Sequence, residues 1–202
     1  MQAVKVRVLS WAPQTRSGTS KRQPGRLGGV RNWDYRYCWL RDATFTLLAF
    51  MHLGYYEEAR AWRNWLFRAV AGSPDQVQIL YGVGGERWLP ELNVSWLPGY
   101  EKSSVRIGNA ADQQMQLDVF WEVADATFQT LKAGMEPPER ARALRPVLFE
   151  YLATAWRQPD EGIWEVRGGP QHFVHSKVMA WVAFDRAANE LEAQSFGDAG
   201  QR

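Results

Sequence analysis

The residues best suited to chemistry lie in the segment PDEGIWEVRGG, residues 159–169. Glu165 follows Trp164 directly, and a carboxyl group that packs against an indole is desolvated. Desolvation raises its pKa and lets it act as a general acid near neutral pH. Glu161 is the other carboxylate here, but Glu165 is the better candidate because Trp164 stands beside it. The alternative is a surface Glu165 that pairs with Arg167, since structural ion pairs also perturb carboxylates.

A second segment, RNWDYRYCWLRDATF, alternates aromatic with polar residues and ends in a polar pair. Its aromatic residues are Trp33, Tyr35, Tyr37 and Trp39. Their rings can stack on a sugar, while Arg41 donates and Asp42 accepts hydrogen bonds from neighbouring hydroxyls. The alternative is an extended segment that packs its rings on the core, with Asp42 as the N-cap of the next helix.

Metal and phosphate chemistry find little support in the sequence. His52, His172 and His175 form no known metal-binding spacing. The segment VRIGNAADQQ has one glycine and lacks the GxGxxG spacing of a phosphate cradle, whereas Asn109 suits a helix cap. We therefore expect neither a metal site nor a cofactor.

Charge and composition exclude several classes of partner. The net charge is +2, from 24 basic and 22 acidic residues, which argues against binding to nucleic acid or to an anionic membrane. Cys38 is the single cysteine and cannot form an internal disulfide, and no stretch reads as a signal peptide or a membrane span. We expect a soluble, cytoplasmic protein with a neutral small-molecule partner.

The hydrophobic periodicity predicts an all-α protein with long ordered loops between its helices. The expected helices cover residues 42–54, 56–72, 110–134, 138–158 and 175–194. The expected core-facing sides carry Phe45, Leu48, Ala49 and Met51 in the first helix, Ala59, Trp62, Leu66 and Val70 in the second, and Val178, Trp181, Val182 and Asp185 in the last. Residues 73–108 show no sustained period, but their aromatic residues argue against disorder. Residues 1–27 read as a short strand followed by a linker arm, and residues 28–202 as the main domain.

Three long motifs in order resemble glycoside hydrolase family 15, the glucoamylase-type enzymes, and especially its bacterial and archaeal branch. They are GGVRNWDYRYCWLRDATFTLLAFMHLGYYEEA, VRIGNAADQQMQLDV and DEGIWEVRGGPQHFVHSKVMAWVAFDRA. The resemblance covers about residues 28–190. It implies an (α/α)6 toroid with a pocket built by loops at one end, of which this chain would supply about the first half.

The resemblance also assigns roles to residues. Trp39, Arg41 and Asp42 match residues that hold the terminal glucose, and Tyr35 matches an aromatic lining that subsite. Glu165 matches the general acid, with Trp164 tuning it and Arg167 orienting the pocket. The expected reaction is hydrolysis of α-glucosidic bonds from non-reducing ends with inversion.

Two departures bear on function. The segment EKSS, residues 101–104, stands where the family has a longer stretch with an additional arginine and proline. The family also takes its general base from a glutamate far downstream, so we expect these 202 residues alone to be inactive. A trehalase of the same family, or a non-catalytic carbohydrate-binding or regulatory relative, is the alternative. The expected partners are an oligosaccharide or disaccharide substrate, and other copies through exposed apolar faces.

Overall fold

The computed structural model describes the backbone of residues 33–199 and the side chains of residues 33–191. The predicted arm at residues 1–27 lies outside the described residues, as does the start of the predicted domain. The described helices are α1 (Leu40–His52), α2 (Tyr56–Ala69), α3 (Asp118–Lys132), α4 (Glu139–Ala155) and α5 (Val174–Ala199). The strands are β1 (Cys38–Trp39), β2 (Leu80–Tyr81), β3 (Leu92–Pro98) and β4 (Ser104–Ile107). Helices therefore dominate, as the periodicity predicts.

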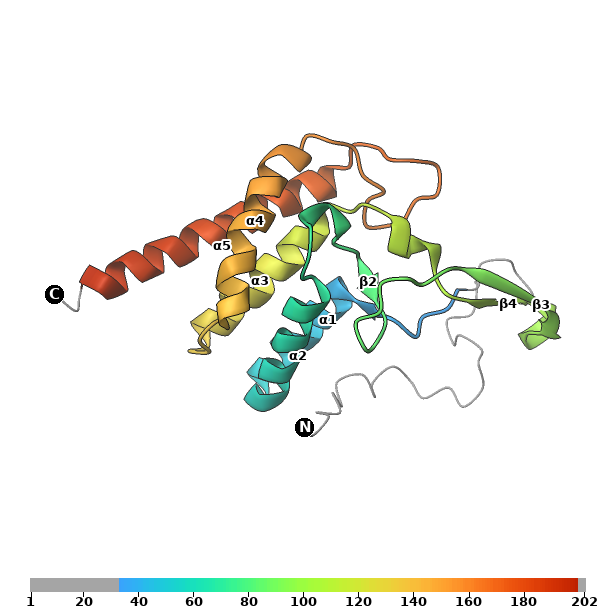
Figure 1. The fold of residues 1–202 in the computed structure, drawn as a ribbon, viewed down its shortest axis with the longest axis horizontal. Helices are drawn as coiled ribbons and strands as arrows, with labels where there is room; N and C mark the ends of the chain where they lie inside the picture. The colour runs from blue at the N-terminus through green and yellow to red at the C-terminus, as the bar shows by residue number, and fades with distance from the viewer. Residues whose placement is uncertain (1–32, 200–202) are drawn as a thin grey trace.

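Helix α3 is central to the arrangement. It packs against α5 and α1, and α1 packs in turn against α2. In Figure 1, α3, α4 and α5 lie together, while the β3–β4 hairpin projects at the opposite end of the molecule. The connection from α4 to α5, which contains Glu165, runs above the start of α3.

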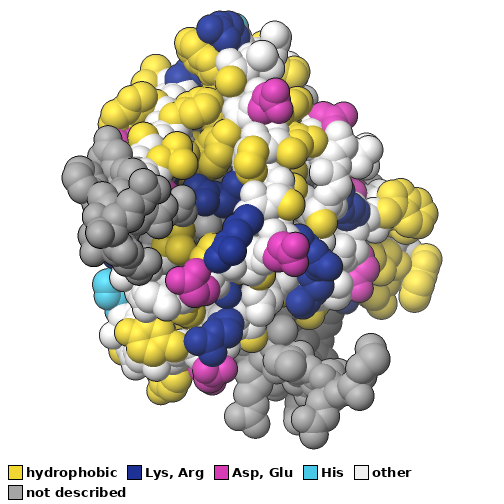
Figure 2. All heavy atoms as spheres, turned by 60° about the vertical axis from the view of Figure 1, so that its left-hand side comes forward, with side chains coloured by type: hydrophobic (Ala, Val, Ile, Leu, Met, Phe, Trp, Pro, Cys, Tyr) yellow, Lys and Arg dark blue, Asp and Glu magenta, His cyan; other side chains and the backbone are white. Residues whose placement is uncertain are grey.

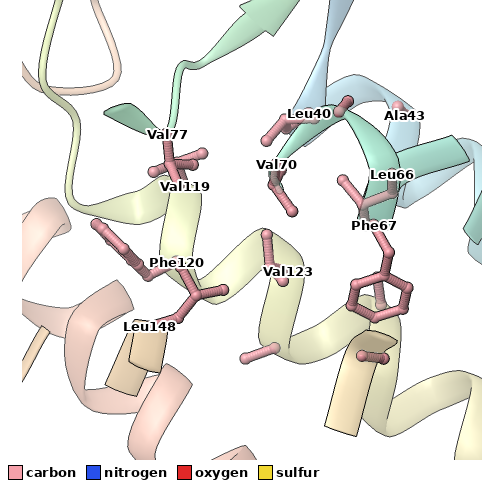
Figure 3. Packing of buried hydrophobic residues seen from close by; sticks show 14 of the residues in the cluster. Leu40, Ala43, Leu66, Phe67, Val70, Val77, Val119, Phe120, Val123 and Leu148 are labelled. Atoms are coloured by element: carbon pink, nitrogen blue, oxygen red, sulfur yellow. The ribbon is translucent and has the colours of Figure 1, made fainter. Parts of the chain in front are cut away.

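The buried core joins the facing sides of these helices. The face predicted for α2 is confirmed, since Ala59, Trp62, Leu66 and Val70 are all buried. Figure 3 shows Leu66, Phe67 and Val70 gathered near Val123 of α3, and Phe120 and Leu148 packed on the other side of α3. Burial of such side chains contributes about 1.5–3 kcal/mol each to folding.

The face predicted for α1 is largely wrong. Met51 packs against the core, but Phe45 is exposed, and the buried residues are Leu40, Ala43 and Leu47. The helix begins at Leu40 and not at Asp42, so Leu40 enters the core and sets the buried face at its i+3 and i+7 positions. Asp42 lies in the first turn and is not the N-cap, a position that Trp39 occupies.

The long segment between α2 and α3 is ordered but contains strands, which the prediction of an all-α chain omits. Strand β1 pairs with β2 antiparallel, and β3 pairs with β4 antiparallel across an irregular register. The predicted third helix is also divided. A 3-10 turn, η4 (Ala110–Gln113), comes first and is capped by Asn109, whose side chain accepts from the Ala111 N–H at 3.0 Å, and α3 begins only at Asp118.

Helix α5 buries small and polar residues and exposes large apolar ones. Ser176, Ala180 and Ala183 are buried, whereas Val174, Val178 and Trp181 are exposed. Figure 2 brings the left-hand side of Figure 1 forward and shows apolar side chains interspersed with charged ones over that face. The predicted inward side of α5 thus includes residues that remain uncovered in this chain.

Candidate active site

Trp39 is placed by short strand pairing at the start of α1. It lies opposite Leu80 in the β1–β2 pair, and the Leu40 N–H donates to the Ile79 carbonyl at 2.9 Å. Only 9% of Trp39 is exposed. The rings of Tyr35 and Tyr37 lie against it, with centroids 5.5 and 6.5 Å away. Three of the four aromatic residues of this segment thus lie together, and the central ring, that of Trp39, is largely covered.

Asp34 fixes the chain just before this wall. Its carboxylate accepts hydrogen bonds from Arg36 Nε at 2.7 Å, from the Tyr37 hydroxyl at 3.2 Å and from the Gly108 N–H at 3.2 Å. Burial alone would raise the pKa of Asp34, but the hydrogen bonds and charge of Arg36, together with the hydrogen bond from Gly108, outweigh it and lower the pKa. Asp34 thus ties the segment of Tyr35 to the end of β4.

Glu165 lies on a loop that is anchored to the start of α3. The Asp160 carboxylate accepts from the Leu117 N–H at 3.0 Å, and the Glu161 carboxylate accepts from the Met115 N–H at 2.9 Å. Glu161 is therefore a structural anchor and not a candidate acid. Asp160 also forms an antiparallel bridge with Gln171, which closes the base of the loop.

Within this loop, the chain turns so that Glu165 reaches Trp39. The Glu165 backbone is left-handed, with φ of 52°, and its N–H donates to the Gly162 carbonyl at 3.0 Å. The Trp39 indole N–H donates to Glu165 Oε1 at 2.9 Å, across 126 residues of sequence. Oε2 of Glu165 has no hydrogen-bond partner among the described residues. This contact brings the WLRD and WE motifs together at one site.

Arg41 and Asp42 lie in the first turn of α1, two and three residues after Trp39. Arg41 Nη2 lies 3.7 Å from Asp42 Oδ2, and the Asp42 side chain is 73% exposed. Arg41 and Trp39 border a small pocket whose other lining residues are Leu40, Ile79, Gln116, Asp118, Val119 and Glu122. Arg41 thus borders the same pocket as the ring that contacts Glu165, whereas the Asp42 side chain is largely open to solvent.

Two buried carboxyl groups of α3 line the same pocket and were not singled out from the sequence. The pKa of Glu122 is raised to about 9, chiefly by burial and next by the neighbouring Asp118, while Thr44 and Arg41 oppose the shift. Burial also raises the pKa of Asp118 against the pull of Arg41 and His175. Glu122 is therefore a neutral carboxylic acid at neutral pH.

Trp164 and Arg167 lie differently from the expectation. Trp164 is 85% exposed, so its ring is in solvent and does not provide the apolar packing expected for Glu165. Trp39 is the indole that contacts this carboxyl group. Arg167 does not pair with Glu165, because its guanidinium binds both carboxylate oxygens of Glu91 at 3.3 and 2.9 Å.

Asp34, Glu91 and Asp160 are further site-forming residues that the sequence did not single out. Each acts across 43 or more residues of sequence, on Gly108, Arg167 and Leu117 respectively. No local spacing signals such contacts. Among the described residues there is no group of three or more histidine, cysteine, aspartate or glutamate side chains that could hold a metal ion.

The described site thus joins a carboxyl group, the indole that binds one of its oxygens and a neighbouring arginine. The model for "Glycosyl hydrolases family 15" matches residues 11–202, and the chain belongs to this family.

Its relatives include curated trehalases. The chain is 44% identical to the trehalases of Mycobacterium tuberculosis and Mycolicibacterium smegmatis over 173 residues, which are 82% of this chain and 25% of each relative. It is 37% identical to trehalase 1 of Sulfolobus acidocaldarius over 167 residues, 81% of this chain and 30% of that relative. The chain thus spans about a quarter to a third of the length of these relatives. No solved structure matches it. Within the described residues, no helix is both long and apolar enough to cross a membrane.

Proposed function

We propose that the whole protein hydrolyses the α-glucosidic bond of trehalose with inversion. The observation that carries this proposal is the hydrogen bond from the Trp39 indole to Glu165, which unites two motifs that the family resemblance assigns to catalysis and glucose binding. Family membership and the trehalase relatives support it. Because the chain spans a minor part of those relatives, the activity is proposed for the whole protein and not for these 202 residues alone.

Glu165 acts as the general acid. The Trp39 N–H occupies Oε1, which leaves Oε2 to carry the proton to the departing glycosidic oxygen. Arg41 and Asp42 bind hydroxyls of the terminal glucose, and Tyr35, Trp164 and Arg167 line the remainder of the pocket. An inverting enzyme also needs a second carboxylate, ~6.5–9.5 Å from the first, to activate water on the opposite face of the sugar. We assign that role to no residue of this chain.

The described helices would form part of an (α/α)6 toroid, with the Glu165 loop and the β3–β4 hairpin at its active-site end. The contacts between the consecutive helices α1 and α2, and α3 and α4, support helical hairpins as the building unit. The substrate pocket is proposed to lie where the loops meet, above the small pocket at Arg41.

Hydrolysis of glucans in the manner of glucoamylase, the first expectation from the sequence, is the second candidate. The similarity to curated trehalases favours trehalose hydrolysis over it. A non-catalytic sugar-binding relative is a third candidate. Catalysis by the whole protein distinguishes the two enzymes from this binding protein.

The test compares substrates with poor and good leaving groups in the whole protein. Trehalose and maltose hydrolysis by wild type would be measured beside Glu165→Gln, because an amide cannot donate the catalytic proton. We expect trehalose turnover to exceed maltose turnover and to fall about 10²–10⁴-fold in the variant. Turnover of α-glucosyl fluoride, whose departure needs little protonation, should be largely retained.

Glu161→Gln is the matched control, since Glu161 lies in the same loop and a glutamine carbonyl oxygen still accepts from the Met115 N–H, so that the loop stays anchored. It should leave the ratio of trehalose to fluoride turnover unchanged. Equal trehalose turnover by Glu165→Gln and wild type would remove Glu165 from the mechanism, and the neutral Glu122 in the adjoining pocket would become the next candidate acid. No hydrolysis of any glucoside by wild type would leave the non-catalytic alternative.

A further inference from the structure

The chain immediately after Glu165 is tied to the β3–β4 hairpin by four side chains, which we call the Glu91 cluster: Trp33, Glu91, Arg106 and Arg167. Arg167 binds Glu91 through its two terminal nitrogens, Nη1 and Nη2, at 3.3 and 2.9 Å, and Arg106 Nη1 lies 3.9 Å from Glu91 Oε1. Both guanidiniums lie over the Trp33 ring, 5.6 and 5.8 Å from its centroid. The cluster thus joins three segments that are far apart in sequence.

Glu91 is built into this cluster and is not a loose surface charge. Its side chain is 15% exposed, and Oε2 also accepts from the Ala110 N–H at 3.4 Å. Burial alone would raise the pKa of Glu91, but the hydrogen bond from Arg167 leads the interactions that lower it. Bidentate pairing of arginine with a carboxylate fixes direction as well as distance. Arg167 is therefore held in one orientation.

The cluster completes a set of anchors on both sides of Glu165. Upstream, Glu161 binds the Met115 N–H. Downstream, Gln114 Nε2 donates to the Val166 carbonyl at 3.1 Å, and Arg167 is held by Glu91. A left-handed backbone at a residue with a side chain costs about 1–2 kcal/mol, so the surroundings must hold Glu165 in it.

We propose that Glu91 is a positioning residue, which acts through Arg167 to hold Glu165 against Trp39. The effect of Glu91 on the position of Glu165 does not depend on the proposed function, whereas its effect on catalysis rests on it. Glu91 carries one negative charge between two guanidiniums. Its loss frees Arg167 to move toward the nearest other carboxylates, and Glu165 is two residues away. Glu91 precedes β3 and Arg106 belongs to β4, so Glu91 is the link between the β3–β4 hairpin and Arg167. Without it, the hairpin no longer holds the chain beside Glu165.

The first measurement reports position without requiring activity. The whole protein would be labelled with 5-fluorotryptophan, and Trp39→Phe would identify the fluorine signal of residue 39. Glu165→Gln should move that signal, which shows that it senses the carboxyl group. We expect Glu91→Gln to shift or broaden the signal, and Arg167→Gln to do the same, since each variant removes one partner of the same pair.

Glu136→Gln is the matched control, because Glu136 also pairs with an arginine, Arg142 at 3.2 Å, but on the exposed connection between α3 and α4. This variant removes the same charge and should leave the residue-39 signal in place. If Glu91→Gln fails to fold, Arg167→Gln decides the question, since the Arg167 side chain is about half exposed and its loss leaves less buried charge.

The second measurement is kinetic. Misplacement of a catalytic group by about 1 Å costs on the order of 10²-fold, so Glu91→Gln should lower kcat for trehalose about 10–100-fold with little change in KM. Turnover of α-glucosyl fluoride should fall much less. Folded Glu91→Gln and Arg167→Gln variants with an unmoved signal would overturn the proposal. An inactive wild type would contradict the proposed function, while the fluorine measurement would still decide whether Glu91 positions Glu165.

Discussion

At the scale of single residues, the unusual group is Glu122. It is 2% exposed, and neither of its side-chain oxygens has a hydrogen-bond partner in the described structure. Its charged neighbours are Asp118, Asp125 and Arg41, and burial is the main reason that its pKa rises to about 9. The folded state therefore binds a proton that the unfolded chain releases near its ordinary pKa of 4.5.

This difference in proton binding predicts how stability depends on pH. Between the two pKa values the folded state binds more protons, so the free energy of unfolding falls as pH rises from about 4.5 toward 9. Glu122→Gln removes the titrating group but keeps a neutral polar side chain. Its stability relative to wild type should increase with pH, by up to about 1.4 kcal/mol per pH unit.

Urea unfolding at several pH values would measure this prediction. Glu150→Gln is the control, because Glu150 is an exposed glutamate of α4. It should run parallel to wild type at every pH. Parallel curves for Glu122→Gln as well would mean that Glu122 is ionised in the folded protein.

The site residues divide by what kind of signal they leave in the sequence. Trp39, Arg41 and Glu165 could be selected because they belong to motifs with a family resemblance. Their proximity could not be derived from spacing, since Trp39 and Glu165 are 126 residues apart. Trp164 was chosen as the partner of Glu165 because it is adjacent in sequence, yet the left-handed turn at Glu165 leaves its ring exposed. Covalent neighbours need not share an environment.

At the scale of elements, the loop that carries Glu165 depends on its glycines in different ways. Gly162 has φ of 63°, and a Cβ there would lie 2.5 Å from the Phe173 ring. Gly169 has φ of 95° but open space around it, and Gly168 has neither constraint. The three positions therefore separate a steric clash from backbone strain.

Alanine substitution at these positions should give a graded loss of stability. Gly169→Ala should cost about 1–2 kcal/mol for the left-handed backbone alone, and Gly162→Ala should cost more because the ring must also move. Gly168→Ala should stay within about 0.5 kcal/mol of wild type. Denaturant unfolding gives all three values, and equal costs at Gly162 and Gly168 would contradict this account of the turn.

The elements also show where periodicity succeeds. Helix α2 has regular apolar spacing, and its buried face was predicted because apolar residues that repeat every 3.6 positions share one side of a helix, which packs on the core. The start of α1 was placed two residues late, since an aspartate before an apolar run resembles an N-cap. The β3–β4 hairpin was missed because its register is irregular between Asn93 and Pro98 and most of β3 is exposed, so no clean alternation marks it.

At the scale of the whole molecule, the apolar residues of α5 decide how this chain behaves by itself. Val174, Val178 and Trp181 recur at helical spacing and are exposed, and Trp181 is 64% accessible. Contiguous apolar patches are uncommon on monomers and generally mark contacts with other protein surface. The described helices thus leave one side of α5 unpartnered, which agrees with the short span of this chain relative to its trehalase relatives.

We expect the 202-residue chain, expressed alone, to self-associate or to bind a hydrophobic dye through this side of α5. Trp181→Lys should lower both the apparent mass in sedimentation and the dye fluorescence, because it places a charge in the middle of the apolar face. Trp96→Lys is the control, since Trp96 is even more exposed than Trp181 but lies on β3. Association is favourable because it removes apolar surface from water. If Trp181→Lys abolishes the aggregate and Trp96→Lys does not, the contact lies on α5. A monomeric wild type that binds no dye and unfolds cooperatively would show that this face needs no partner.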